Sequence, residues 1–223
     1  MLPIFLPIAA VLYINAGALS PKDTDQVVTN TATALKLLAI AAKHPAQLYA
    51  AGTCAVLGPG ALAVSYTAIA TLSQDRGSAL AMVAALTGSI GAFCGAITNV
   101  LVFPNLAAAA TAHTTPGAAA QFLMTTFNSG FGQAFQYAYF IGIYAAPLLM
   151  GVALWRNQAV PRWLAVLFFA GLEVAQQQGS SGPVVILFML PFAAAMILLA
   201  ARIWPAAPLP ASQPQLEPAG VPV

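Results

Sequence analysis

Long uncharged stretches, separated by short polar or charged segments, dominate the pattern along this chain. A helix needs about 20 mostly apolar residues to cross the hydrocarbon core of a bilayer. Six stretches meet that requirement, and they are residues 2–19, 46–72, 78–103, 132–155, 163–178 and 183–201. The pattern therefore predicts an all-α fold, a polytopic membrane bundle with six transmembrane helices.

The residues between Gly77 and Trp155 include no Asp, Glu, Lys or Arg, yet this stretch is far too long for a single span. Polar and helix-breaking residues divide it, namely Pro104, Asn105, His113, Thr114, Thr115 and Pro116. We therefore expect the third span to end at residue 103 and a polar connection to follow it.

The segment 25–43 has a different pattern. Val28, Thr31, Leu35, Leu38 and Ala42 recur at helical spacing, whereas the polar positions tend to the other side, at Asp25, Thr29, Lys36 and Lys43. This predicts one amphipathic surface helix over residues 25–43. It lies either along the membrane surface, with Leu35 and Leu38 toward lipid, or solvated and packed over the mouth of the bundle.

Composition restricts the class of protein further. Apolar residues make up 60% of the chain and charged residues 5%, with a mean hydropathy of +0.84, whereas soluble domains are about 25% charged. A net charge of +2 supplies no basic patch for nucleic acid, and two cysteines supply neither a disulfide framework nor a zinc cluster. We therefore expect the lipid bilayer as partner and no nucleic acid. The membrane domain covers residues 1–204, and the proline-rich segment 205–223 is predicted to be a disordered cytoplasmic tail.

Arginines and tryptophans indicate the orientation. Six spans place both termini on one side, and that side carries Arg76, Arg156, Arg162 and Arg202, with Trp155, Trp163 and Trp204 beside them. Positive charge and interfacial aromatic residues mark the cytoplasmic face, although the other side carries Lys22, Lys36 and Lys43. We expect a multi-pass protein of a bacterial cell membrane with both termini cytoplasmic.

The first span has a second interpretation. Ala16-Gly17-Ala18 fits a signal-peptide cleavage site, and the apolar run before it is short. A basic residue should precede such a run, and none does, so a transmembrane helix is favoured. The abrupt start at Met1-Leu2-Pro3 also suggests that a few residues upstream are missing from the reading frame.

The order of features resembles a known family. A surface helix ends in His44-Pro45, and later Gly151-Val152-Ala153-Leu154-Trp155-Arg156 leads through a short loop to Pro161-Arg162-Trp163-Leu164. From the first span to Trp204 the chain resembles the uncharacterised six-helix membrane proteins, common in actinobacteria, that are grouped as a domain of unknown function. The resemblance implies a fold and a compartment, and it implies no activity.

Several residue types bear on packing. Gly88, Gly91 and Gly95 fall on nearly one face of the third span, which predicts close packing inside the bundle rather than a dimer interface. Cys54 and Cys94 lie at similar heights in neighbouring spans, where a disulfide is conceivable but free thiols are favoured. Prolines bend three spans, at Pro59, Pro147 and Pro191. Bent helices line substrate sites in transporters, but proline is frequent in membrane helices generally.

Candidate chemistry is sparse. His44 at a span entry and His113 in an outer loop do not reach the depth of a haem, and the spans contain no paired carboxylates. We expect no metal, no cofactor and no enzymatic activity. Glu173 is the only acidic residue in a predicted span, about 15 Å above Trp163 and near the midplane. It should face the bundle or be a neutral carboxylic acid.

Gln176 and Gln177 share the helix face of Glu173, and the residues predicted at its depth are Tyr13, Asn15 and Tyr144. These six residues form the candidate binding site. It is either a proton-linked or ligand-binding site or a structural interhelical hydrogen bond.

Two functional classes therefore remain. The first is a non-enzymatic bundle that binds or transports a small lipophilic or proton-coupled ligand through polar residues of its outward half. The second is an accessory subunit that interacts through its helical surface. A polar cavity converging on Glu173 would favour the first class, and a polar patch facing lipid, with no cavity, would favour the second. The pattern leaves the oligomeric state open.

Overall fold

The structure is a computed structural model that describes residues 2–24, 28, 30–73, 77–111, 115–158, 160–177, 182 and 184–204. All regular elements in these ranges are helical, which confirms the all-α fold. They are η1 (Leu2–Ile4), α1 (Phe5–Leu19), α2 (Thr31–Lys43), α3 (Pro45–Ala70), α4 (Ser78–Thr111), α5 (Pro116–Asn128), α6 (Gly130–Asn157), α7 (Arg162–Gln177) and α8 (Val185–Ile203).

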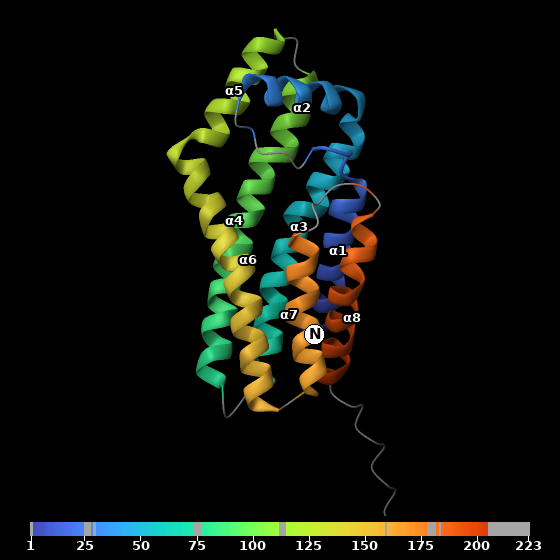
Figure 1. Ribbon diagram of the computed structural model, residues 1–223, viewed down its shortest axis with the longest axis vertical. Coiled ribbons are helices and arrows are strands. Elements are labelled where there is room, and N and C mark those ends of the chain that lie inside the picture. Colours follow the sequence, from blue (N-terminus) through green and yellow to red (C-terminus); the bar gives the residue numbers. More distant parts are fainter. Residues whose placement is uncertain are drawn as a thin grey trace, which may run out of the picture.

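Five helical segments among these ranges are long and apolar enough to cross a membrane: η1 with α1, α3, α4, α6 and α8. This is the architecture of a multi-pass membrane protein. The shorter α7, with 16 residues, runs parallel to the same bundle and packs against α6 and α8 (Figure 1). Other predictions fall outside the described residues: the orientation of Arg76, the outer position of His113, the start of the surface helix at Asp25 and the disordered tail 205–223.

Large apolar side chains cover the outside of the bundle. On α4, Met82, Leu86, Ile90 and Phe93 are each more than half exposed, and they repeat every three or four residues along one helix face. A soluble monomer seldom exposes so continuous an apolar surface. This face is suited to contact with lipid chains.

The opposite face of α4 carries the glycines that the sequence assigned to packing. Gly88, Gly91 and Gly95 are all buried. At the crossing of α4 and α6 the two backbones meet directly, since a Cβ atom on Gly91 would lie 2.5 Å from Gly142 Cα. The prediction of internal packing is confirmed. Both cysteines are free, as the sequence favoured.

The helix α2 lies across one end of the bundle, and α5 leans beside it (Figure 1). We call this the capped end, and we call the opposite end, where α6 and α8 finish, the arginine end. The side chain of Asn30 accepts a hydrogen bond of 2.9 Å from the Thr33 N–H, which fixes the beginning of α2. The described helix therefore begins at Thr31.

The structure buries one face of α2 against the bundle. It consists of Ala34, Leu37, Leu38 and Ala41, whereas Leu35 is 39% exposed and lies beside the exposed Lys36. Leu38 therefore packs on protein, and the exposed Leu35 is compatible with the predicted contact with lipid. The face that packs is set by contact with α4 and α5, and the many alanines of this segment allow several registers.

The helix break predicted after residue 103 does not occur. The helix α4 continues through Pro104 to Thr111, and a further helix, α5, follows where a polar connection was expected. A proline removes one backbone hydrogen bond and bends a helix without ending it when packing holds both sides. Beyond Pro104, Leu106 and Ala107 pack with α2 and α5.

This packing forms a second hydrophobic cluster, separate from the main core of the bundle. Its buried members include Ala34 and Leu37 of α2, Leu106 of α4, and Ala120 and Leu123 of α5. At 34 residues, α4 is about 50 Å long and exceeds the hydrocarbon thickness of about 30 Å. Its surplus length carries the capped end.

Candidate functional site

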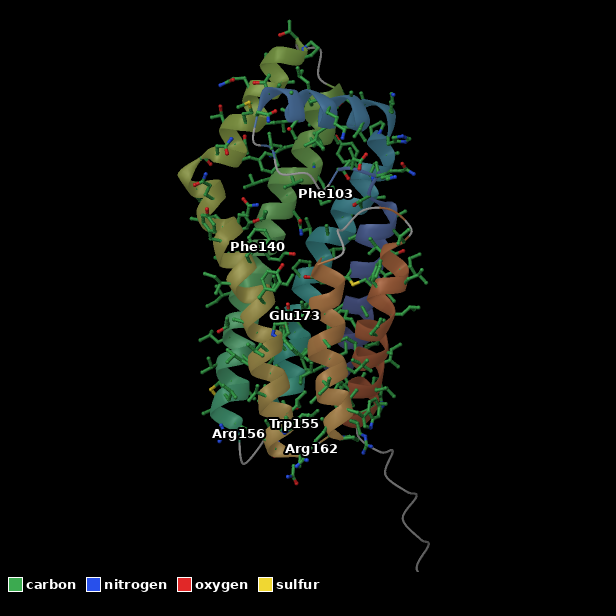
Figure 2. The ribbon with its side chains drawn as sticks, in the orientation of Figure 1. Phe103, Phe140, Trp155, Arg156, Arg162 and Glu173 are labelled. Atoms are coloured by element: carbon green, nitrogen blue, oxygen red, sulfur yellow. The ribbon has the colours of Figure 1, made fainter. Side chains whose placement is uncertain are left out.

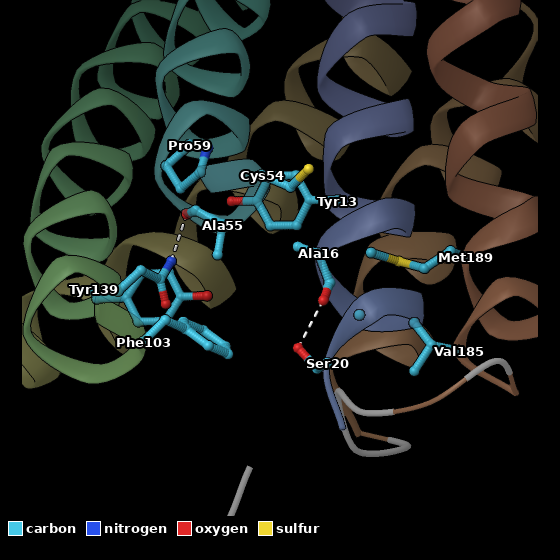
Figure 3. A pocket seen from close by; sticks show the side chains of 12 residues that line it. Tyr13, Ala16, Ser20, Cys54, Ala55, Pro59, Phe103, Tyr139, Val185 and Met189 are labelled. Atoms are coloured by element: carbon cyan, nitrogen blue, oxygen red, sulfur yellow. Dashed lines mark hydrogen bonds between the residues drawn. The ribbon is translucent and has the colours of Figure 1, made fainter. Parts of the chain in front are cut away.

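A cavity of about 120 Å³ lies inside the bundle near the capped end (Figure 3). Five helices contribute to its wall, together with the residue that ends α1. The lining residues are Tyr13, Ala16, Gly17, Ser20, Cys54, Ala55, Pro59, Asn99, Phe103, Tyr139, Val185 and Met189. This volume accommodates several water molecules or the polar part of a small organic molecule.

A broken hydrogen bond in α3 shapes the cavity wall. Pro59 has no N–H, so the carbonyl of Ala55 loses the donor that an unbroken helix would supply. The side chain of Asn99, on α4, donates from Nδ2 to Ala55 O at 2.6 Å (Figure 3). The bend in one helix is thus satisfied by an amide from the next. In a membrane a side-chain donor must replace the missing backbone N–H, because lipid offers no hydrogen-bond donor.

Two tyrosine rings enter this region over glycines of neighbouring helices. A Cβ atom on Gly58 would lie 3.2 Å from Tyr13 Cδ2, and one on Gly95 would lie 2.5 Å from Tyr139 Cδ2. The glycines leave the space that the rings occupy. Figure 3 shows Tyr13 reaching from α1 toward Cys54 and Ala55 on α3.

The hydroxyl of Tyr13 is buried and has no hydrogen-bond partner among the described residues. Such a group loses its hydration without compensation, at a cost of about 1–3 kcal/mol. Tyr13 is also held firmly, since its ring packs edge-on against Phe192 with centroids 6.5 Å apart. It is therefore a fixed polar group that a molecule in the cavity can satisfy.

Gly182, between α7 and α8, contacts α1 beside the cavity. The N–H of Gly182 donates to Gly17 O at 3.0 Å, and Gly17 lines the cavity. Gly182 has a φ of +88°, which favours glycine at this position. This hydrogen bond thus ties Gly182 to the cavity wall.

The chemical character of the cavity is polar but uncharged. Hydroxyl, amide and thiol groups are contributed by Tyr13, Asn99 and Cys54, and the remaining wall is largely apolar, with Phe103 and Met189. None of the described lining residues is an acid or a base. The cavity is suited to a neutral molecule that has at least one hydrogen-bonding group.

The structure describes the side chains of four of the six residues of the sequence-based site. Tyr13 lines the cavity, whereas Asn15 donates to Val11 O of its own helix at 2.9 Å and Tyr144 is 36% exposed. The side chains of Gln176 and Gln177 lie outside the described part of α7. Equal depth in the membrane did not bring Tyr13, Asn15 and Tyr144 together.

Glu173 lies on α7, about halfway along the bundle (Figure 2), and it does not line the cavity. It is partly buried and within electrostatic range of Tyr66, whose buried hydroxyl also has no partner among the described residues. Tyr66 packs edge-on against Phe168, with ring centroids 6.3 Å apart. Glu173 and Tyr66 are thus not lining residues of the cavity, although Tyr66 lies within electrostatic range of Tyr13, which is one.

The sequence interpretation missed Asn99 and Tyr139. A signal was present for Asn99, because Pro59 inside a span implies a free carbonyl at Ala55 that a polar residue of a neighbouring helix must satisfy. Nothing comparable marked Tyr139, whose position depends on the close approach of α4 and α6. The sequence interpretation treated Pro59 as an ordinary proline of a membrane helix. The structure shows that the Ala55 carbonyl, which this proline leaves without a backbone donor, accepts a hydrogen bond from Asn99.

Compared with protein-family models, curated proteins and solved structures, the chain matches none. In the part of the chain that the structure describes, no three His, Cys, Asp or Glu side chains gather to hold a metal ion.

Proposed function

We propose that this is a multi-pass protein of a bacterial cell membrane that binds a small, neutral, lipophilic molecule in the cavity beneath the capped end. The observation that carries the proposal is the buried Tyr13 hydroxyl, which has no partner among the described residues and lines the cavity. A ligand with a hydroxyl, carbonyl or amide group would pair with it. The apolar wall of Phe103 and Met189 would hold the remainder of the molecule.

The proposed membrane arrangement has six spans, with α7 as the fifth, and α2 as a surface helix on the outward side. Its 16 residues give α7 a length of about 24 Å, which spans most of the hydrocarbon core. Arg156, Arg162 and Arg202 lie at or near the helix ends of the arginine end, and Lys36 and Lys43 lie on α2. The positive-inside rule favours the arginine end, with both termini, in the cytoplasm.

The cavity supports a small-molecule site over an accessory subunit, because polar side chains from several helices line one recess between them, although they do not converge on Glu173. It lies in the proposed outward half, where α1 ends and α8 begins. If Glu173 carries a proton, it does so outside the ligand cavity, since Glu173 is not part of the cavity lining.

Recovery of a bound molecule tests the proposal. Protein purified in mild detergent is extracted with organic solvent, and the extract is compared by mass spectrometry between the wild type and Ala16→Phe, whose side chain fills the cavity. The matched control is Val11→Phe on the same helix, because Val11 is 55% exposed on the outside. We expect one small molecule that accompanies the wild type and Val11→Phe and is depleted with Ala16→Phe.

Equal recovery from all three proteins, or no enriched molecule, would overturn the proposal. Loss of the molecule from Tyr13→Phe as well would identify the hydroxyl as its polar contact. The unfolding temperature of each variant is measured alongside, so that loss of the ligand is distinguished from loss of the fold.

A further inference from the structure

A groove of about 320 Å³ lies between α6 and α7, toward the arginine end, on the outside of the bundle. Its wall includes Leu148, Gly151 and Trp155 of α6 and Ala165, Val166 and Phe169 of α7. Every one of these side chains is apolar or aromatic, and Leu148, Trp155 and Val166 are each more than 40% exposed. The groove therefore opens toward the lipid.

Gly151 lies at the floor of the groove. A Cβ atom at this position would lie 3.1 Å from Phe169 Cβ, so α6 and α7 are in close contact at this point and the groove lies outside it. A slot of this kind accepts a flexible hydrocarbon chain, which gains apolar contact on both sides. Its contents must come from the membrane, since it faces the region that lipid occupies.

Two arginines stand at the mouth of the groove. The guanidinium of Arg162, at the first position of α7, lies 5.3 Å from the ring centroid of Trp155, a groove residue. Arg156 follows Trp155 directly in the last turn of α6, and both arginines are exposed. Figure 2 shows Trp155, Arg156 and Arg162 together at this end of the bundle.

Neither arginine forms an ion pair with a carboxylate among the residues that the structure describes. The stacking of Arg162 on Trp155 restricts the guanidinium to the mouth and leaves its N–H groups available. A guanidinium binds phosphate through two parallel hydrogen bonds, which a planar donor set favours. Two such groups would also repel the ammonium of a zwitterionic head group.

We propose that this groove binds one acyl chain of an anionic phospholipid, whose phosphate pairs with Arg162 and Arg156. The site is separate from the cavity beneath the capped end and does not depend on a ligand there. A zwitterionic phospholipid would place its ammonium near both arginines, so the anionic lipid is preferred.

Quenching of Trp155 by brominated lipid tests this site directly. Trp163→Phe and Trp204→Phe leave Trp155 as the only tryptophan, beside the groove. The protein is reconstituted in equimolar phosphatidylglycerol and phosphatidylcholine vesicles, with either the first or the second lipid brominated in the upper part of one chain. We expect brominated phosphatidylglycerol to quench Trp155 more strongly than brominated phosphatidylcholine.

Charge-neutral variants identify the contact. Arg162→Gln and Arg156→Gln should each lower the relative affinity for phosphatidylglycerol by about fivefold, equivalent to about 1 kcal/mol for one surface arginine. Arg202→Gln, on α8, makes the same change of charge at the same end of the bundle, away from the groove. It should leave the preference unchanged.

Two results would overturn the proposal. The first is equal quenching by the two brominated lipids in the parent protein. The second is an equal loss of preference in Arg202→Gln and Arg162→Gln, which would show that general charge at this membrane surface, rather than the groove, attracts the lipid.

Discussion

The hydrogen bond from Asn99 to Ala55 predicts a measurable coupling between two positions on different helices. Asn99→Leu keeps the approximate volume of the side chain but leaves the Ala55 carbonyl without the donor that lies 2.6 Å away. Leaving a buried acceptor unpaired costs about 1–3 kcal/mol, whereas measured interhelical hydrogen bonds in membranes average about 0.6 and reach about 1.7 kcal/mol. We expect the free energy of unfolding to fall by about 1–2 kcal/mol.

The coupling appears when Pro59 is also changed. Pro59→Ala restores a backbone N–H that can donate to Ala55 O within α3, so the carbonyl no longer needs Asn99. In that background, Asn99→Leu should cost less than about 0.5 kcal/mol, and the double-mutant cycle should give a coupling of about 1 kcal/mol. Equal costs in the two backgrounds would refute the reasoning.

Unfolding in mixed micelles by increasing sodium dodecyl sulfate, followed by tryptophan fluorescence, measures these free energies. Asn15→Leu is the matched control. Asn15 donates to Val11 O at 2.9 Å, but that carbonyl already accepts a backbone hydrogen bond within α1. Its loss should change the free energy of unfolding by less than about 0.5 kcal/mol, because no group becomes unpaired.

Four further outcomes are expected. Gly91→Ala should lower the free energy of unfolding by about 1–3 kcal/mol, because its Cβ would meet Gly142 Cα at 2.5 Å. Gly60→Ala should leave the free energy of unfolding unchanged or raise it by up to about 1 kcal/mol, since nothing lies within 4 Å of its Cβ. An equal decrease in both glycine variants, measured in the same way, would contradict this reasoning. Glu173→Gln should leave the unfolding temperature in detergent unchanged, because the Glu173 carboxyl forms no hydrogen bond to a described side chain that glutamine would lose. A large decrease would show that the carboxylate itself is structural. Gln158→Cys, without the two native cysteines, should be protected from an impermeant thiol reagent in intact cells, and external labelling would reverse the proposed orientation.

Hydrophobic runs in the sequence were sufficient to predict an all-helical membrane protein, because each membrane helix must bury its own backbone hydrogen bonds and present apolar residues to lipid. The end of α4 was not predictable from Pro104 alone. Whether a helix bends or ends at proline depends on the contacts beyond it, and here Leu106 and Ala107 pack with α2 and α5. The face of α2 that packs on protein was not predictable for a related reason, since Ala34 and Ala41 give little contrast with their neighbours.

The candidate site shows how much the depth of a residue along the membrane normal says about its contacts. Counting residues from the interface gave the depths of Tyr13, Asn15 and Tyr144, but depth is only one of the coordinates that a contact requires. The direction in which each side chain points depends on helix rotation, and Tyr144 points outward while Tyr13 lines the cavity. Helix rotation in turn depends on close approaches such as Gly91 to Gly142, which only the folded bundle shows.

The second hydrophobic cluster has a consequence for the order in which the chain assembles during synthesis. The apolar face of α2 packs on Leu106 and Leu123, which leave the ribosome long after α2 is complete. At 5–20 residues per second, α5 begins roughly 4–15 s after α2 ends. During that interval the newly made α2 must cover its apolar face with the membrane surface, and it moves from lipid to protein when α4 and α5 arrive. Synthesis of α4 and α5 thus precedes completion of the capped end.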